Sequence, residues 1–104
     1  MHTASGTIIC RGGSHVAAIF ILDEIQYAFN ANISPALPPF TAHSATVTFD
    51  DVASLTSSRS FSGHIGTDTF ELNVDNGVQI KAQLNDPGVS SDSTFDGSGA
   101  WMQV

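Results

Sequence analysis

The sequence predicts an all-β fold, either a small antiparallel barrel or a two-sheet sandwich of about seven or eight short strands. Apolar and polar residues alternate over several short segments, and clusters of glycine, proline, asparagine and aspartate separate those segments. Charged residues make up only 12% of the 104 residues, and β-branched and aromatic residues supply most of the apolar content, which favours strands over surface helices. The length fits a single domain, residues 1–104, with one core.

The first segments along the chain are predicted to form strands. Residues 6–11 and 15–22 are separated by Gly12-Gly13, which indicates a first hairpin, and the alternation continues as far as Phe29. The alternative is a helix near residues 15–29, packed on an antiparallel sheet in an α+β fold, because some polar residues there recur at spacings of three and four. The β-branched and aromatic residues of this segment favour strands.

Residues 30–40 are predicted to be the one long connection, because they contain three prolines, which disrupt regular structure. Within this connection, residues 35–40 form a stiff apolar loop whose large side chains are Leu37 and Phe40. Such a loop can pack over its own core or contact a partner. Residues 45–49 follow as a short strand.

The register of a hairpin over residues 70–84 can be derived from the sequence. Apolar residues alternate with polar ones on both sides of a turn, at Phe70, Leu72, Val74, Val78, Ile80, Ala82 and Leu84. The pleat requires a three-residue turn with Gly77 in the left-handed conformation, so that Val74 faces Val78. On the other face Glu71 then lies opposite Lys81, the only lysine.

Two further strands complete the pattern. A loop over residues 66–69 pairs residues 61–65 with residues 70–74 and places His64 opposite Glu71. The last strand is predicted over residues 97–104 and carries Trp101.

A Ser-Gly pair opens three of these segments, at Ser5-Gly6, Ser62-Gly63 and Ser98-Gly99. Glycines inside strands mark bends or bulges, which the closure of a small barrel requires. The recurrence therefore favours the barrel over the sandwich.

The charge balance excludes some classes of partner. The net charge is −7 with three basic residues, so there is no basic surface for nucleic acid, and an anionic membrane is disfavoured. No apolar run is long enough for a transmembrane segment, and the N-terminus lacks a signal-peptide pattern. We therefore expect a soluble protein that is cytoplasmic by default.

Candidate site residues lie in one row on the predicted outer face. His64, Glu71 and Lys81 neighbour one another across three strands and could bind a ligand, or Glu71 could orient His64 for proton transfer. The simpler interpretation of the row is a solvated face with one ion pair. Trp101 could stack on a sugar ring, although a single tryptophan in a small domain commonly belongs to the core.

No pattern predicts a cofactor or a metal ion. The four histidines are scattered, and Cys10 is the only cysteine, so no disulfide framework or zinc motif is present. Residues 92–97 match only the opening half of a calcium-binding loop, because Gln103 occupies the position where that loop needs a glutamate.

Three functions follow from these observations. The first is a non-catalytic binding module for a small molecule or glycan, with Trp101, His64, Glu71 and Lys81 as ligand-binding residues. The alternative is an interaction protein that forms homo-oligomers through sheet edges or through residues 35–40. The third is an enzyme that uses the pair His64 and Glu71.

Overall fold

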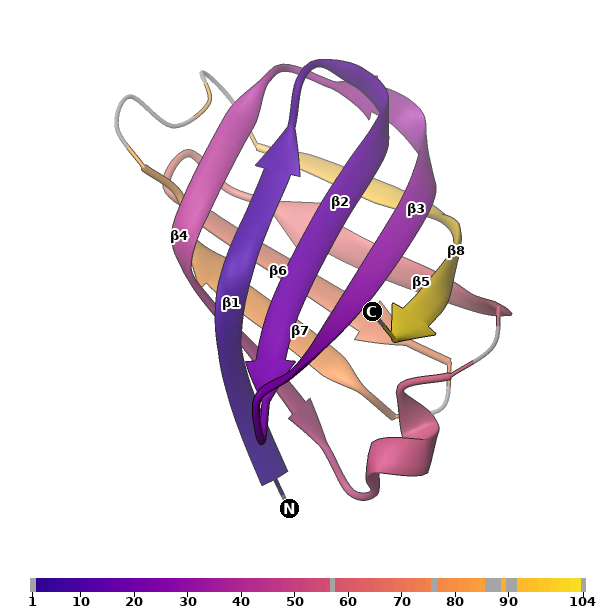
Figure 1. Cartoon of the computed structure of the whole chain (residues 1–104). Helices are drawn as coiled ribbons and strands as arrows, with labels where there is room; N and C mark the ends of the chain where they lie inside the picture. The colour runs from indigo at the N-terminus through magenta and orange to yellow at the C-terminus, as the bar shows by residue number, and fades with distance from the viewer. Residues whose placement is uncertain (1, 57, 76, 86–88, 90–91, 104) are drawn as a thin grey trace.

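The chain folds into one closed barrel. The computed structural model describes residues 2–56, 58–75, 77–85, 89 and 92–103, with Pro35 and Val52 described by their backbone alone. The strands are β1 (His2–Cys10), β2 (Gly13–Leu22), β3 (Ile25–Leu37), β4 (Phe40–Phe49), β5 (Ser58–Ile65), β6 (Thr69–Val74), β7 (Gln79–Gln83) and β8 (Ser93–Gln103). A short 3-10 helix, η1 (Val52–Ser54), precedes β5. The strands close in the order β1-β2-β3-β8-β5-β6-β7-β4, which confirms the all-β prediction in its barrel version (Figure 1).

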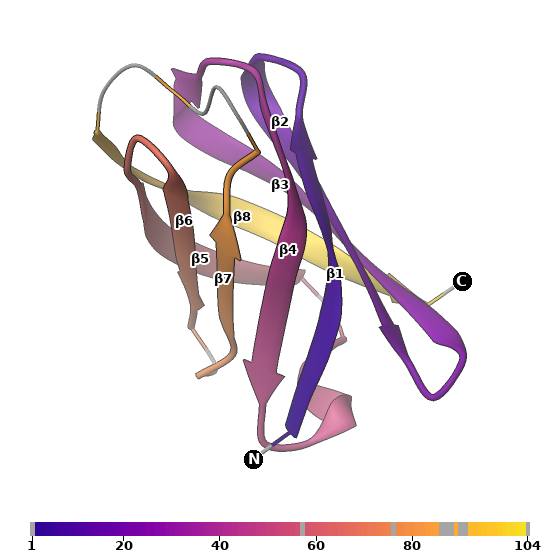
Figure 2. The ribbon, with the colours of Figure 1, turned by 90° about the vertical axis from the view of Figure 1, so that its left-hand side faces the viewer.

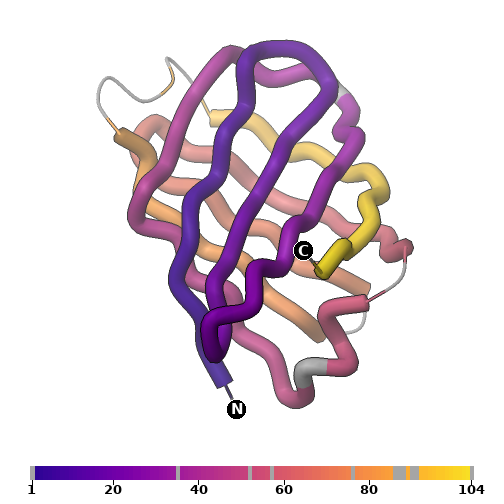
Figure 3. The backbone as a smooth tube through the Cα atoms, viewed as in Figure 1, coloured from indigo at the N-terminus to yellow at the C-terminus, as the bar shows by residue number. Residues whose placement is uncertain are grey.

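Two Greek keys make up the barrel. In space, β4, β1, β2 and β3 are neighbours in that order, and β8, β5, β6 and β7 repeat the arrangement. The ladders between β3 and β8 and between β4 and β7 join the two keys and close the sheet. Figure 3 traces the chain through the first key and then the second.

The hairpin of β6 and β7 has the predicted register. The Val74 N–H donates to the carbonyl oxygen of Val78 over 2.8 Å, and the Gly77 N–H donates to the carbonyl oxygen of Val74 over 3.0 Å. Gly77 has a φ of 90°, the left-handed backbone that this turn requires. Residues 61–65 pair with residues 70–74 as predicted.

Residues 15–29 lie in β2 and β3, so the helix alternative is wrong. The two strands meet with Leu22 opposite Ile25, and the turn between them consists of Asp23 and Glu24. Their φ angles are 51° and 66°, as in a type I′ turn, whose twist matches that of the flanking strands. Figure 2 shows this hairpin projecting beyond the rest of the barrel wall.

The long connection predicted over residues 30–40 does not exist. β3 continues to Leu37 and β4 begins at Phe40, so only residues 38–39 connect them. Pro35 fits into β3 because the ladder to β8 ends one residue earlier, at Ser34, and the ladder to β2 is irregular at this point. Neither neighbouring strand therefore needs a backbone N–H group from residue 35, and a proline at this position does not disrupt the sheet.

Several strands extend beyond their predicted bounds, and the early starts of β4 and β8 have a common reason. β4 starts at Phe40 rather than at residue 45, and β8 starts at Ser93 rather than at residue 97. The extra residues at the start of each strand are mostly small or polar, so they lack the alternation of apolar residues from which a strand is predicted. Backbone pairing with β1 and β5, respectively, holds them in the sheet.

Apolar side chains fill the interior. Aromatic rings form a continuous series with centroids 4.7 to 6.3 Å apart, in the order Phe20, Trp101, Phe29, Phe61, Phe95, Phe70 and Phe40. No described residue that is buried is polar or charged. Leu55, which follows η1, is buried too. The interior is therefore a packed core rather than a ligand cavity of the kind that wider barrels enclose.

Two of the three Ser-Gly pairs occupy equivalent places in the two Greek keys. Gly6 lies in the first strand of one key and Gly63 in the first strand of the other. A Cβ atom at Gly6 would overlap the backbone oxygen of Ile19, and one at Gly63 would lie 2.5 Å from the backbone oxygen of Glu71. Each of these oxygens belongs to the second strand of its key, so in both keys the first two strands approach too closely for a side chain at this position.

Candidate functional site

Charged side chains are distributed unevenly over the barrel wall. β1, β2, β3 and β4 contain no Asp, Glu, Lys or Arg. The strands of the second key contain Arg59, Glu71, Lys81 and Asp96. The wall formed by the first key is therefore uncharged, in a chain whose net charge is −7.

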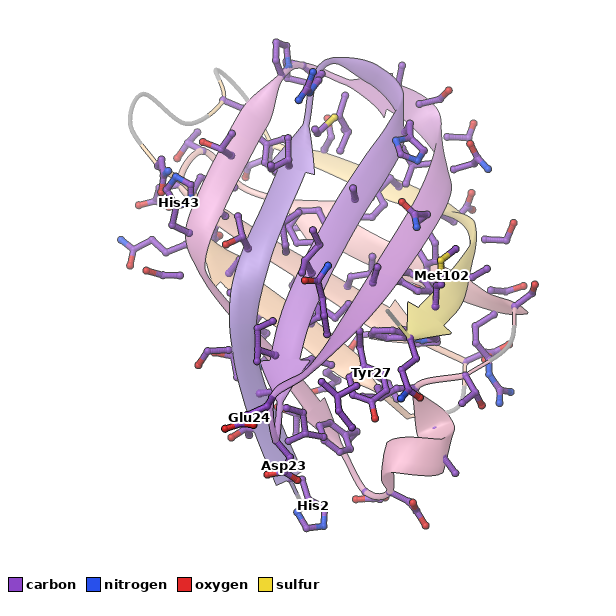
Figure 4. All side chains as sticks on the ribbon, in the orientation of Figure 1. His2, Asp23, Glu24, Tyr27, His43 and Met102 are labelled. Atoms are coloured by element: carbon purple, nitrogen blue, oxygen red, sulfur yellow. The ribbon has the colours of Figure 1, made fainter. Side chains whose placement is uncertain are left out.

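The uncharged wall carries an outward-facing apolar surface, which we call the apolar face. It crosses β1, β2, β3 and the end of β8, and its apolar residues are Ile9, Ala17, Ile19, Ile21, Ala28, Ala100 and Met102. Two polar residues of β3 lie among them, Asn30 between Ala17 and Ala100 and Gln26 beside Ile21. Ile19, Ile21 and Met102 are 38%, 52% and 58% exposed. Met102 points outward from the end of β8 (Figure 4). Contiguous exposed apolar patches are common at the interaction surfaces of proteins.

Opposite charges flank the two ends of the apolar face. Arg11 lies in the turn between β1 and β2, and Asp23 and Glu24 lie at the tip of the β2–β3 hairpin, at the lower end in Figure 4. A hollow of about 220 Å³ adjoins Arg11 and is lined by Ile9, Arg11, Gly12, His15 and Ala17. One end of the face thus combines a cation with a recess, and the other presents Ile21 beside two carboxylates.

The predicted row His64, Glu71 and Lys81 is present on the outer wall of the second key. His64 lies opposite Glu71 in the ladder between β5 and β6, and Glu71 lies opposite Lys81 in the ladder between β6 and β7. All three side chains are exposed. An open groove of about 560 Å³ is lined by Ser34, Ser62, Gly63, His64, Glu71, Asn73, Thr94, Phe95 and Asp96. The groove brings His64 and Glu71 together with Asp96 but does not include Lys81.

The groove is suited to a polar ligand. Its two carboxylates, Glu71 and Asp96, accept hydrogen bonds, and the Asn73 amide and the serine and threonine hydroxyls both donate and accept them. The volume falls within the range of small-molecule sites. Phe95, the only Phe, Tyr or Trp among the lining residues, is 4% exposed, so it offers little surface on which a sugar ring could stack.

The other predicted site residues belong to the core. Trp101 is 7% exposed, and its ring lies 4.7 Å from that of Phe29. Leu37 and Phe40 are 3% and 6% exposed. Trp101 therefore cannot act as an open stacking platform in this conformation, and Leu37 and Phe40 contribute apolar surface to the barrel itself rather than to an exposed loop.

The sequence reasoning did not identify the apolar face. Ile19 and Ile21 lie within an almost continuous apolar run, residues 16–22, whose inward and outward positions look alike. The signal that could have identified it is the distribution of charge, because Arg11, Asp23, Glu24, Asp50 and Asp51, the charged residues before residue 52, all lie outside the strands.

No helix among the described residues has the length and apolar character needed to cross a bilayer. In the same part of the chain, no group of three or more His, Cys, Asp or Glu residues is arranged to hold a metal ion. No family model matches the sequence, and no curated protein or solved structure is significantly similar to it. The apolar face and the polar groove are therefore the features from which a function can be argued.

Proposed function

We propose that this chain is a non-catalytic interaction protein that pairs with a second copy of itself through the apolar face. The observation that carries the proposal is the coincidence of two features on one wall: exposed Ile19, Ile21 and Met102, and strands without charged residues. Burial of such a surface is favourable, and no charge has to be desolvated within the strands.

The charge distribution favours a second copy as the occupant. Two chains of net charge −7 repel each other, and contact through the uncharged wall keeps the carboxylates of the second key on the outside of the pair. The opposite charges at the two ends of the face add a preference for an antiparallel arrangement, in which Arg11 of each copy approaches Asp23 and Glu24 of the other.

A twofold axis near Ile19 gives an antiparallel pair in which Asp23 of each copy lies over His15 of the other, at the end of the face that carries Arg11. Ile21 and Ala17 lie two residues on either side of Ile19 in β2, so the axis places Ile21 of each copy over Ala17 of the other. Ala17 lines the hollow of about 220 Å³ beside Arg11, and this recess can receive the isoleucine side chain. The face is thus self-complementary in shape as well as in charge.

Replacing Ile21 with lysine should convert a dimer into a monomer without unfolding the chain. Ile21 is 52% exposed in the single chain, so folding tolerates a polar group there, whereas the proposed interface would place each lysine in the recess beside Arg11 of the other copy. We expect the dissociation constant, measured by sedimentation equilibrium, to rise at least about 100-fold.

Two comparisons test the interface and its orientation. Gln79→Lys makes the same charge change on exposed β7, outside the face, and should leave the association unchanged. Arg11→Glu should weaken the dimer, and adding Glu24→Arg should partly restore it because the paired charges are exchanged. A wild-type chain that stays monomeric at millimolar concentration would contradict the proposal, as would equal effects of Ile21→Lys and Gln79→Lys.

The groove supports a second candidate function, the binding of a small polar ligand such as a glycan unit. The specific observation is the convergence of His64, Glu71 and Asp96 in a groove of about 560 Å³. A monosaccharide panel should then shift the NMR signals of the His64 ring at millimolar concentration, and Glu71→Gln should remove the shift. Asp50→Asn, which makes the same charge change away from the groove, is the control. Shifts that persist in Glu71→Gln would contradict this candidate.

A further inference from the structure

The open groove that contains His64, Glu71 and Asp96 is lined by polar side chains with unused hydrogen-bonding capacity. None of the side-chain hydrogen bonds between described residues involves the side chain of a lining residue. The hydroxyl, amide, imidazole and carboxylate groups of the groove are therefore available to a ligand, and its volume of about 560 Å³ leaves room for one.

The charge of the groove is negative on both sides of β5. Ser62 and His64 of β5 form the middle of the groove, with Asp96 opposite Ser62 on β8 and Glu71 opposite His64 on β6. At the level of the backbone, β8 and β6 are two strand spacings apart, about 10 Å, which a single sugar ring hydrogen-bonded at both ends can bridge. No Lys or Arg is among the described lining residues, so the groove attracts cations.

The two carboxylates differ in their neighbours. Glu71 stands opposite Lys81 on β7, and this ammonium group offsets part of its charge. Asp96 stands between Ser62 and Ser34, so neither ladder gives it a basic neighbour. Asp96 is therefore the carboxylate at which an additional positive charge gains most, whereas Glu71 is better suited to accept hydrogen bonds from hydroxyl groups.

Building on the second candidate function, the binding of a small polar ligand in this groove, we infer that the ligand is an amino sugar. Its protonated amine donates hydrogen bonds to the Asp96 carboxylate, and its hydroxyl groups bind Glu71, His64 and the serine and threonine hydroxyls nearby. The two carboxylates would repel an acidic sugar, and a neutral sugar would leave Asp96 without a charged partner. A simple amine would leave most of the polar lining without a hydrogen bond from the ligand.

Dissociation constants for glucosamine and glucose, measured from the NMR signals of the His64 ring at a constant pH of about 7, test the assignment. Glucosamine should bind about three- to fivefold more tightly than glucose, the size expected for one ion pair at an exposed carboxylate. Added sodium chloride should reduce this preference and leave glucose binding unchanged, because salt screens charges. Propylamine should bind more weakly than glucosamine, and glucuronate more weakly than glucose.

The variant Asp96→Asn tests where the positive charge of the ligand lies. Asparagine keeps the shape of the side chain and its capacity for hydrogen bonds, so this variant should bind glucosamine and glucose equally. Its affinity for glucose should stay at the wild-type level, which also reports that the barrel is folded. Asp50→Asn removes the same charge away from the groove and should retain the preference for glucosamine.

The possible results distinguish the amino-sugar assignment from ligand binding in the groove as such. Glucose bound as tightly as glucosamine by the wild type would overturn the assignment and leave the groove as a site for neutral sugars. A preference that persists in Asp96→Asn or is lost in Asp50→Asn would overturn it as well, as would propylamine bound as tightly as glucosamine. If no sugar shifts the His64 signals, both the assignment and the second candidate function fail.

Discussion

Replacing Gly6 with alanine should lower the free energy of unfolding by about 3 kcal/mol, at the upper end of what an overpacked core costs. The new Cβ atom would overlap the backbone oxygen of Ile19 and lie 2.8 Å from the carbon of the same carbonyl group and 2.7 Å from a ring carbon of Phe20. The ring can move, but the carbonyl belongs to the ladder between β1 and β2. The two strands must therefore separate, and the melting temperature should fall by more than about 10 °C.

Ser5→Ala provides the control for this substitution. Ser5 is the exposed neighbour of Gly6, and its alanine variant should melt within about 2 °C of wild type. Gly63→Ala should behave like Gly6→Ala, because the equivalent carbonyl, that of Glu71, lies 2.5 Å from the position of its Cβ atom. A Gly6→Ala variant as stable as Ser5→Ala would refute the close approach of the first two strands.

Replacing Phe29 with alanine should cost about 3–5 kcal/mol, the range for removing a buried aromatic side chain. Phe29 is 2% exposed, and its ring contacts those of Trp101 and Phe61, so its loss interrupts the aromatic series in the middle of the barrel. Denaturant titration followed by circular dichroism measures the change.

The neighbouring outward residue supplies the comparison for Phe29. Asn30 is exposed on the same strand, and Asn30→Ala should change the stability by less than about 0.5 kcal/mol. If both variants lost the same free energy, the inward and outward faces of β3 would be assigned wrongly.

The hairpin of β6 and β7 could be predicted from the sequence because two independent constraints act there. Only one register places the apolar residues on one face, and only that register also places Glu71 opposite Lys81 and gives Gly77 the left-handed position. The row from His64 to Lys81 follows from the same register. Local turn chemistry and the pleat thus suffice where a strand has one polar and one apolar face.

Residues 30–40 could not be predicted in this way. The prolines predicted a loop, but whether a proline disrupts a strand depends on whether a neighbouring strand needs its N–H group. That depends on where β8 stops pairing with β3, at Ser34, and this contact joins residues far apart in the sequence. The burial of Leu37 and Phe40 follows from the same long-range pairing and was equally inaccessible.

The candidate sites could not be predicted in full from the sequence either, because their residues come together only when the barrel closes. The alternation in β2 does not say which isoleucines face outward, so the exposure of Ile19 and Ile21 required the complete sheet. The polar groove takes its lining from β3, β5, β6 and β8, and β8 becomes the neighbour of both β3 and β5 only when the barrel closes.

The arrangement of the two Greek keys has a consequence for biosynthesis. The first key is translated first, but its outer strands β3 and β4 find their partners only in β8 and β7, with pairs as distant as Tyr27 and Gln103. Until residues 93–103 have been made, the nascent chain carries open strand edges, and β1–β4 contain no charged residue to act as a gatekeeper against aggregation. The ladders of β3 with β8 and of β4 with β7 form late, and they are also the ones that cover the open edges and protect the chain from aggregation. A chaperone that shields β3 and β4 would act in the interval before β8 is made.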